Sequence, residues 1–109
     1  MQVLNQLNID EPDRKEIFLE ILSDKYCRSI LESIMDTSKS AIEISREKEI
    51  PLSTVYRRIQ QLHDAHMIRT SGIITDEGKR LFLYKSKTKE VSTRFCDGKI
   101  TVSVVYNKN

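Results

Sequence analysis

The sequence predicts an α+β protein with a helical N-terminal half followed by two β-hairpins. Three observations support this fold class. Apolar residues recur at intervals of three and four up to about residue 68, which is the period of helices packed on one side. Beyond that point the pattern changes to short runs rich in Ile, Leu, Val, Phe and Tyr, typical of strands. Two turn signals, Gly78 and Asp97-Gly98, divide these runs, and glycine favours the positive φ of hairpin turns.

The composition indicates one soluble domain. A chain of 109 residues with 39% hydrophobic content is large enough to bury a core without metal or disulfide staples. We find no apolar run approaching the roughly 18 residues of a membrane span and no signal-peptide pattern at the N-terminus. The chain is therefore expected to be cytoplasmic.

Neither the cysteines nor the histidines form a metal-binding pattern. Cys27 and Cys96 lie in different expected elements and in no CxxC spacing, so we expect two reduced thiols, one buried and one near the surface. His63 and His66 are three residues apart on one expected helix, but they are interpreted as core or capping residues because no third ligand is apparent. We expect no metal and no cofactor.

Three helices are expected before residue 50. Within residues 1–22, the first nine residues have a short apolar pattern that is compatible with a helix or a docking arm. A helix from about Pro12 to Leu22 would then turn Phe18, Ile21 and Leu22 inward. The next helix spans about residues 24–35. Ser40 with Glu43 has the capping-box pattern that begins a third, ending near residue 48. The expected buried positions of the second and third helices are Cys27, Ile30, Leu31, Ile34, Ala41 and Ile44.

Residues 51–68 predict a helix with one polar face outward. Leu52, Val55, Ile59 and Leu62 are spaced by three, four and three, which places them on one buried stripe. From Leu52 to Leu62 there are two arginines and no carboxylate, although 31% of the chain is charged. The first acidic residue is Asp64. The opposite face would carry Ser53, Arg57, Gln60 and Gln61, with Thr54, Tyr56 and Arg58 on its flanks.

These outward groups are the kinds that read nucleic acid. Arg hydrogen-bonds guanine, Gln hydrogen-bonds adenine, and Ser and Thr contact bases or phosphates. Any surface helix is polar outside, so the face alone is also compatible with an ordinary surface. The short helix before it, joined by a tight turn, makes the pair a helix-turn-helix arrangement.

The strand pattern after this helix predicts a wing. Residues 69–74 and 80–85 would form a hairpin in which Arg69, Lys79 and Arg80 lie on phosphates, while Asp76 and Glu77 at the tip would repel them. The contact would come from the sides of the hairpin, or the tip would touch no DNA. Charge supports a polyanion partner on this half: residues 1–45 hold five basic and nine acidic groups, and residues 46–109 hold thirteen and seven.

The last unit, residues 90–106, predicts a second hairpin. A type I′ turn at Asp97-Gly98 would pair Phe95 with Ile100 and continue to Thr93 with Val102 and Val91 with Val104. All six side chains would share one face. Because a lone hairpin is marginally stable, this face must pack either on the chain's own helices or, together with the N-terminal segment, in a homodimer interface.

Several runs resemble the archaeal ArsR-like winged helix-turn-helix transcription regulators. They are LSDKYCRSILESI, SAIEIS, IPLSTVYRRIQQLHDAHMI and GKRLFLYKSK, which together cover roughly residues 20–87. The resemblance implies a DNA-binding and usually dimeric regulator, with Ser53, Thr54, Tyr56, Arg57 and Arg58 facing DNA. Bacterial members often sense metal through clustered cysteines, and this chain departs from that pattern.

The sequence is thus interpreted as a winged helix-turn-helix protein that binds double-stranded DNA as a homodimer and regulates transcription. Its parts would be an N-terminal arm and helix (1–22), a helical core (23–68), a wing (69–87) and a C-terminal hairpin (90–106). The alternative is a protein-docking module; no enzyme motif is present. The expected DNA-binding residues are Ser53, Thr54, Tyr56, Arg57, Arg58, Gln60 and Gln61 on the helix, with Arg46, Lys48, Lys79 and Arg80 around it.

Overall fold

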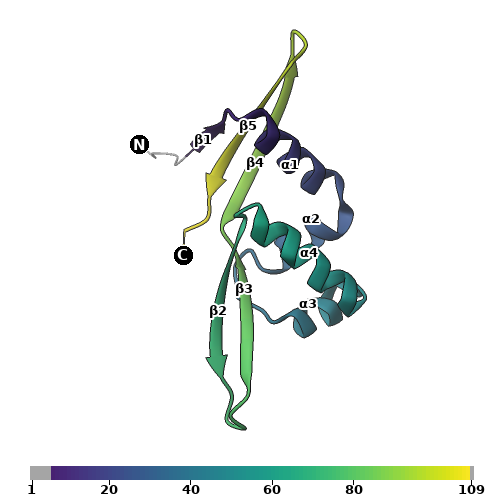
Figure 1. Cartoon of the computed structure of the whole chain (residues 1–109), viewed down its shortest axis with the longest axis vertical. Helices are drawn as coiled ribbons and strands as arrows, with labels where there is room; N and C mark the ends of the chain where they lie inside the picture. Colours follow the sequence, from purple (N-terminus) through teal and green to yellow (C-terminus); the bar gives the residue numbers. More distant parts are fainter. Residues whose placement is uncertain (1–5, 109) are drawn as a thin grey trace.

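Helices and strands occupy opposite sides of the molecule. The computed structural model describes residues 6–108, and its extents are 56 × 34 × 21 Å. In Figure 1 the helices gather on one side, while two hairpins extend toward opposite ends of the long axis. The helices are α1 (Pro12–Ser23), α2 (Lys25–Ser33), α3 (Ala41–Lys48) and α4 (Leu52–Asp64).

Local signals start three of these helices as predicted. Pro12 occupies the first turn of α1, where its missing N–H would have no intrahelical partner. The Asp24 carboxylate caps α2 by accepting the Cys27 backbone N–H at 2.8 Å. Ser40 and Glu43 form the reciprocal capping box of α3. These caps satisfy N–H groups that the helix itself leaves free.

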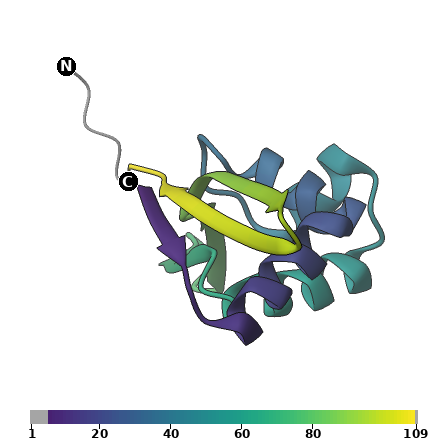
Figure 2. The same cartoon turned by 90° about the horizontal axis from the view of Figure 1, so that it is seen from above.

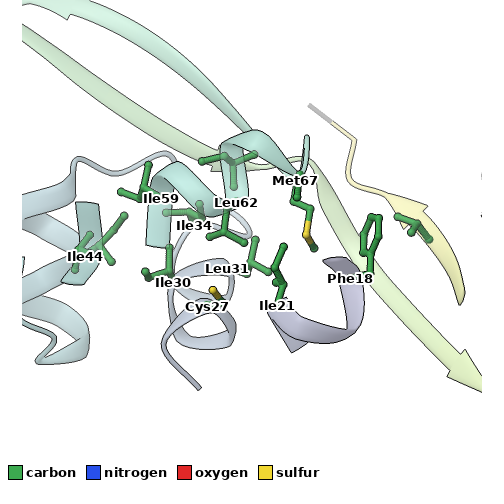
Figure 3. Packing of buried hydrophobic residues seen from close by; sticks show 14 of the residues in the cluster. Phe18, Ile21, Cys27, Ile30, Leu31, Ile34, Ile44, Ile59, Leu62 and Met67 are labelled. Carbon is green, nitrogen blue, oxygen red and sulfur yellow. The ribbon is translucent and has the colours of Figure 1, made fainter. Parts of the chain in front are cut away.

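The helices meet along their apolar stripes. Cys27, Ile30 and Ile34 of α2 and its C-cap are fully buried, and Leu31 is nearly so, as the spacing predicted. Figure 3 shows these side chains packed with those of α1, α3 and α4. The rest of the helical core consists of Phe18, Ile21, Ala41, Ile44, Val55, Ile59, Leu62 and Met67, as well as Ile50 and Ala65 next to α4.

Two expectations for the last helix are wrong. Leu52 remains 38% exposed because it lies in the first turn, beyond the edge of the core. The helix ends at Asp64 rather than Ile68, since the chain enters the left-handed region at His66, with φ +59°. His63 and His66 are exposed, so neither is a core residue. The capping alternative holds for His66, which follows the C-cap Ala65 in the left-handed conformation and donates its backbone N–H to the His63 carbonyl at 3.0 Å.

Both predicted hairpins are present. The first joins β2 (Ile68–Ile74) to β3 (Arg80–Ser86), with Gly78 at φ +79° in the connection. The second joins β4 (Thr88–Cys96) to β5 (Lys99–Tyr106). Asp97 and Gly98 both have positive φ, as a type I′ turn requires, and the pairs from Phe95–Ile100 to Val91–Val104 have the predicted register.

The N-terminal segment forms a strand, which the sequence left undecided between a helix and a docking arm. β1 (Gln6–Ile9) pairs antiparallel with β5, so the second sheet has the order β1-β5-β4. Figure 2 shows β1 beside β5, with α1 next to the sheet. Met1–Asn5, part of the expected N-terminal arm, lie outside the described residues.

The second hairpin packs on the chain's own helices over only half its length. Val102 and Val104 are buried in the common core with Ile9, whereas Phe95 near the tip is 74% exposed. Because the hairpin extends beyond the helices (Figure 1), they cover only the part nearest the middle of the molecule. The expected apolar face is thus only partly covered within the chain.

Candidate nucleic-acid interface

A tight turn holds α3 and α4 against each other. Helix α3 stops at Lys48 because Glu49 adopts a left-handed conformation, with φ +54°. Ile50 then enters the core at 4% exposure, and its carbonyl accepts the Ser45 hydroxyl at 2.5 Å. Pro51 follows as the N-cap of α4. Helix α4 is thereby anchored at its start, and Val55, Ile59 and Leu62 turn its other face outward.

The outward face of α4 is polar over two turns. Ser53, Arg57 and Gln60 are exposed, and Tyr56 is 51% exposed. Gln60 donates from its amide to the Asp64 carboxylate at 2.9 Å, so its side chain is oriented along the helix. Thr54 is half-buried at the edge of this face. The helix therefore presents hydroxyl, phenol, guanidinium and amide groups together.

Arg58 is directed toward α2 instead. Its Nε donates to Asp24 Oδ2 at 2.9 Å and its Nη2 to Oδ1 at 3.4 Å, a two-pronged pair that only a guanidinium forms readily. The guanidinium also lies 5.8 Å from the centre of the Tyr26 ring. Both charged side chains are about three-quarters buried, at 23% and 26% exposure. Arg58 thus connects the middle of α4 to the N-terminus of α2.

The same contact shifts the acidity of the groups around it. Partial burial raises the pKa of Asp24, but the hydrogen bonds from the Cys27 backbone and Arg58 outweigh burial, so this pKa lies below its usual value. Burial, followed by the neighbouring Asp24 carboxylate, raises the pKa of the Cys27 thiol to about 12. Gln61 lies against this thiol, with Oε1 3.8 Å from Sγ. Gln61 is therefore turned partly inward.

Basic groups on α3 differ in how they are paired. Lys48 forms an ion pair with Glu32 of α2 and lies 3.9 Å from a Glu47 oxygen, and Lys39 pairs with Glu47. Arg46 is exposed and has no ion pair within the described residues. Of the two α3 cations expected to bind DNA, Arg46 is therefore the one that faces solvent rather than a carboxylate of the described residues.

A two-residue strand contact holds the β2–β3 hairpin beside α3 and α4. Lys39, just before α3, exchanges both backbone hydrogen bonds with Tyr84 of β3, at 3.0 and 2.8 Å. Lys79 and Arg80 at the far end of the hairpin are exposed, and Arg80 lies over the Phe82 ring at 5.8 Å. Asp76 and Glu77 are exposed in the connecting loop.

A shallow hollow separates this hairpin from α4. Its volume is about 250 Å³, and it is lined by Ile59, Gln60 and His63 of α4 and by Thr70, Phe82 and Tyr84 of the hairpin. Burial raises the pKa of the Tyr84 hydroxyl above its usual value. The exposed aromatic ring of Phe82 therefore lines the same hollow as Gln60 on the outward face of α4.

Eight of the eleven expected DNA-binding residues are at least partly exposed on α3, α4 and the β2–β3 hairpin, and three are turned toward partners within the chain. Sequence reasoning missed Asp24 as the partner of Arg58, although it identified Asp24 as a cap. It also missed the Lys39–Tyr84 contact, for which a sequence carries no local signal. The eight residues at the surface are Ser53, Thr54, Tyr56, Arg57, Gln60, Arg46, Lys79 and Arg80; the three turned inward are Arg58, Gln61 and Lys48.

The described residues contain neither a metal-binding cluster nor a membrane-spanning helix. Among residues 6–108, no three His, Cys, Asp or Glu side chains are grouped closely enough to hold a metal ion. Within the same range, none of the helices has the length and apolar content needed to cross a bilayer. Cys27 is buried and Cys96 exposed, which confirms the prediction for the two thiols.

The fold is similar to those of two solved structures. A possible transcriptional regulator from Methanosarcina mazei Go1 aligns over 76% of this chain and 76% of its own, with a TM-score of 0.56 and 20% sequence identity. NolR from Sinorhizobium fredii aligns over 82% of this chain and 84% of its own, with a TM-score of 0.56 and 17% identity. At these identities the likeness concerns the fold. No protein-family model and none of the curated proteins matches the chain.

Proposed function

We propose that the protein is a winged helix-turn-helix regulator of transcription that binds double-stranded DNA as a dimer. In this proposal α3 and α4 are the helix-turn-helix, α4 is the recognition helix, and the β2–β3 hairpin is the wing. The observation that carries it is the exposed face of α4, which runs from Ser53 to Gln60 without a carboxylate. The fold shared with a possible transcriptional regulator supports the same assignment.

The exposed groups divide into base-reading and phosphate-binding sets. Arg57 projects from the middle of the outward face and is proposed to hydrogen-bond a guanine in the major groove. Arg46 on α3 and Lys79 and Arg80 at the far end of the β2–β3 hairpin are exposed and are proposed to contact phosphates. Ser53, Thr54, Tyr56 and Gln60 would complete the contact surface of α4.

The three inward-turned residues have a different role in this proposal. Arg58 and Lys48 already face carboxylates at ion-pair distance, so contact with phosphate would require them to leave those partners. Gln61 lies against the Cys27 thiol. We assign these three to holding α4 and α3 in place rather than to touching DNA.

Binding measured across a salt series tests the proposal. A duplex is first selected from random-sequence DNA by the full chain, and its affinity is then measured between low and moderate salt. Several phosphate contacts predict a steep decrease in affinity with salt. Affinity that is absent even at low salt would contradict DNA binding.

A variant of Arg57 tests the base contact. Arg57→Ala is expected to lower specific affinity by about 1–3 kcal/mol and to reduce discrimination at one base pair. Lys99→Ala is the matched control, because Lys99 is an exposed cation near the opposite end of the molecule. If Arg57→Ala binds every sequence as tightly as the parent chain, the assigned base contact is wrong.

The second candidate is a protein-docking module. It is favoured by the exposed apolar side chains of the β2–β3 hairpin, since Ile74 is 68%, Phe82 46% and Ile73 44% exposed. The acidic loop at Asp76 and Glu77 would also suit a basic protein partner better than a phosphate. The salt series separates the two candidates, because a docking module has no reason to bind DNA at low salt.

A further inference from the structure

The β4 strand presents an unpaired edge. In the sheet order β1-β5-β4, strand β4 bonds only to β5, so within residues 6–108 its other edge has no strand partner. The residues from Lys89 to Cys96 are exposed except for Val91, which is half-buried. A long exposed edge is a template for pairing with another strand.

The side chains along this edge are self-complementary. Glu90 and Arg94 are exposed and point to the same face, because they are four residues apart on a strand. Neither forms an ion pair within the described residues. Residue 92 lies midway between them. A strand paired antiparallel with an identical copy about Ser92 therefore places Glu90 of each copy opposite Arg94 of the other.

An exposed aromatic ring lies on the other face of the same strand, and a groove lies at the beginning of the strand. Phe95 is 74% exposed, the highest value among the large apolar side chains described. The groove has a volume of about 400 Å³ and lies between the helices and the beginning of β4. Its apolar lining is formed by Leu22, Leu31, Met35 and Val91, and Lys89 and Glu90 line its strand side.

The same pairing brings the ring to the groove. A register centred on Ser92 brings Phe95 of one copy to the beginning of the other copy's β4, where that strand is irregular between Thr88 and Glu90 and where the groove lies. In the regular part of the strand, Val91 of the other copy faces Thr93, which shares the face of Phe95. Phe95 shares the face of Val91, which lines the groove. Paired residues of neighbouring strands point to the same side, so each ring is directed toward the partner's groove.

We propose that the protein forms a symmetric dimer by antiparallel pairing of β4 with the β4 of a second copy, centred on Ser92. Two Glu90–Arg94 pairs fix the register, and each Phe95 occupies the groove of the other copy. This inference rests on the dimeric part of the proposed function and specifies its interface. The β4–β5 and β2–β3 hairpins extend toward opposite ends of the molecule (Figure 1), so the proposed wing extends away from the paired edge.

Charge reversal tests the interface directly. With Glu90→Arg alone, an arginine faces an arginine at both 90–94 contacts of the dimer. With Arg94→Glu alone, a glutamate faces a glutamate at both contacts. Each variant is expected to weaken the dimer at least about tenfold, since facing like charges are costly at an interface. The molar mass in solution is measured by light scattering and sedimentation over a range of chain concentrations, with circular dichroism to show that each variant is folded.

Two combinations are expected to restore the dimer. The doubly reversed chain, Glu90→Arg with Arg94→Glu, has opposite charges facing again. An equimolar mixture of the two single variants should form a heterodimer, because one chain supplies two positive and the other two negative groups. Glu77→Arg, on the β2–β3 loop, is the control charge reversal and should leave the dimer unchanged, whereas Phe95→Ala should weaken it.

The outcomes separate the interface from the proposed function. If the parent chain dimerises and either single-reversal variant dimerises as tightly as the parent, the proposed interface is wrong. Single variants that do not associate on mixing also contradict it. Neither result bears on DNA binding. A parent chain that is monomeric at every concentration contradicts the proposed dimer. The salt series on DNA then tests whether the chain binds DNA as a monomer. Restored dimers in a chain that binds no DNA support the interface and contradict the proposed function.

Discussion

The two hairpins have the same local structure but are held in the molecule in different ways. The β2–β3 hairpin reaches the core near its base, through Ile68, Tyr84 and Ser86, and leaves Ile74 68% exposed near its far end. The β4–β5 hairpin gains a third strand, β1, and buries Val102 and Val104 completely or nearly so. The comparison indicates that the β4–β5 hairpin belongs to the folded core, whereas the β2–β3 hairpin extends from it as a surface.

The largest difference is expected in stability. Val104→Ala removes two buried methyl groups and is expected to lower the free energy of unfolding by about 2 kcal/mol. Ile74→Ala, the matched apolar truncation on the other hairpin, should change it by less than about 0.5 kcal/mol. Urea unfolding at one fixed chain concentration measures both. Equal losses would show that the β2–β3 hairpin is as much a part of the core as the β4–β5 hairpin.

A smaller effect is expected where α4, which leads into the β2–β3 hairpin, is held to α2. Asp24→Asn keeps a good N-cap but removes the charge that Arg58 faces at 2.9 Å. We expect a loss of about 1 kcal/mol at pH 7, because the pair is partly solvated. Asp76→Asn, a charge removal in the exposed β2–β3 loop, should leave stability nearly unchanged.

The same variant has a defined pH dependence. The pKa of Asp24 in the folded chain lies below its ordinary value of 3.8, so the carboxylate contributes its full stabilisation above that value. The contribution is lost as the pH falls through the lower folded pKa. Urea unfolding of the parent chain and Asp24→Asn should therefore differ at neutral pH and converge well below pH 3.8. A difference that persists in strong acid would show that the lost stability does not come from the charge of Asp24.

The smallest effects concern phosphate contacts at the hairpin tips. Lys79→Ala and Arg80→Ala on the β2–β3 hairpin should each reduce the slope of log affinity against log salt by about 1. Lys99→Ala on the β4–β5 hairpin should not change it. Fluorescence titration of the selected duplex at several salt concentrations measures these slopes. A reduced slope for Lys99→Ala would place the second hairpin on DNA as well.

Features governed by nearby residues were predictable from the sequence. The Ser40–Glu43 capping box, the Asp97-Gly98 turn and the register of β4 with β5 all follow from residues close together in the chain. The buried stripe of α2 follows from helical periodicity. Periodicity failed at the ends of α4, because Leu52 lies beyond the core and the helix stops before His66, and Leu22 of α1 is only half-buried.

By itself, the sequence determined the order of helices and hairpins, their turns and the polar face of α4. These features depend on backbone conformation and on hydrogen bonds between neighbours. The tertiary structure decided that β1 is a strand beside β5, that Tyr84 pairs with Lys39, and that Arg58 faces Asp24. Such contacts join residues 34 or more positions apart, and their partners come together only when the helices and sheets pack. The same packing left one edge of β4 without a strand partner among residues 6–108 and left Phe95 exposed.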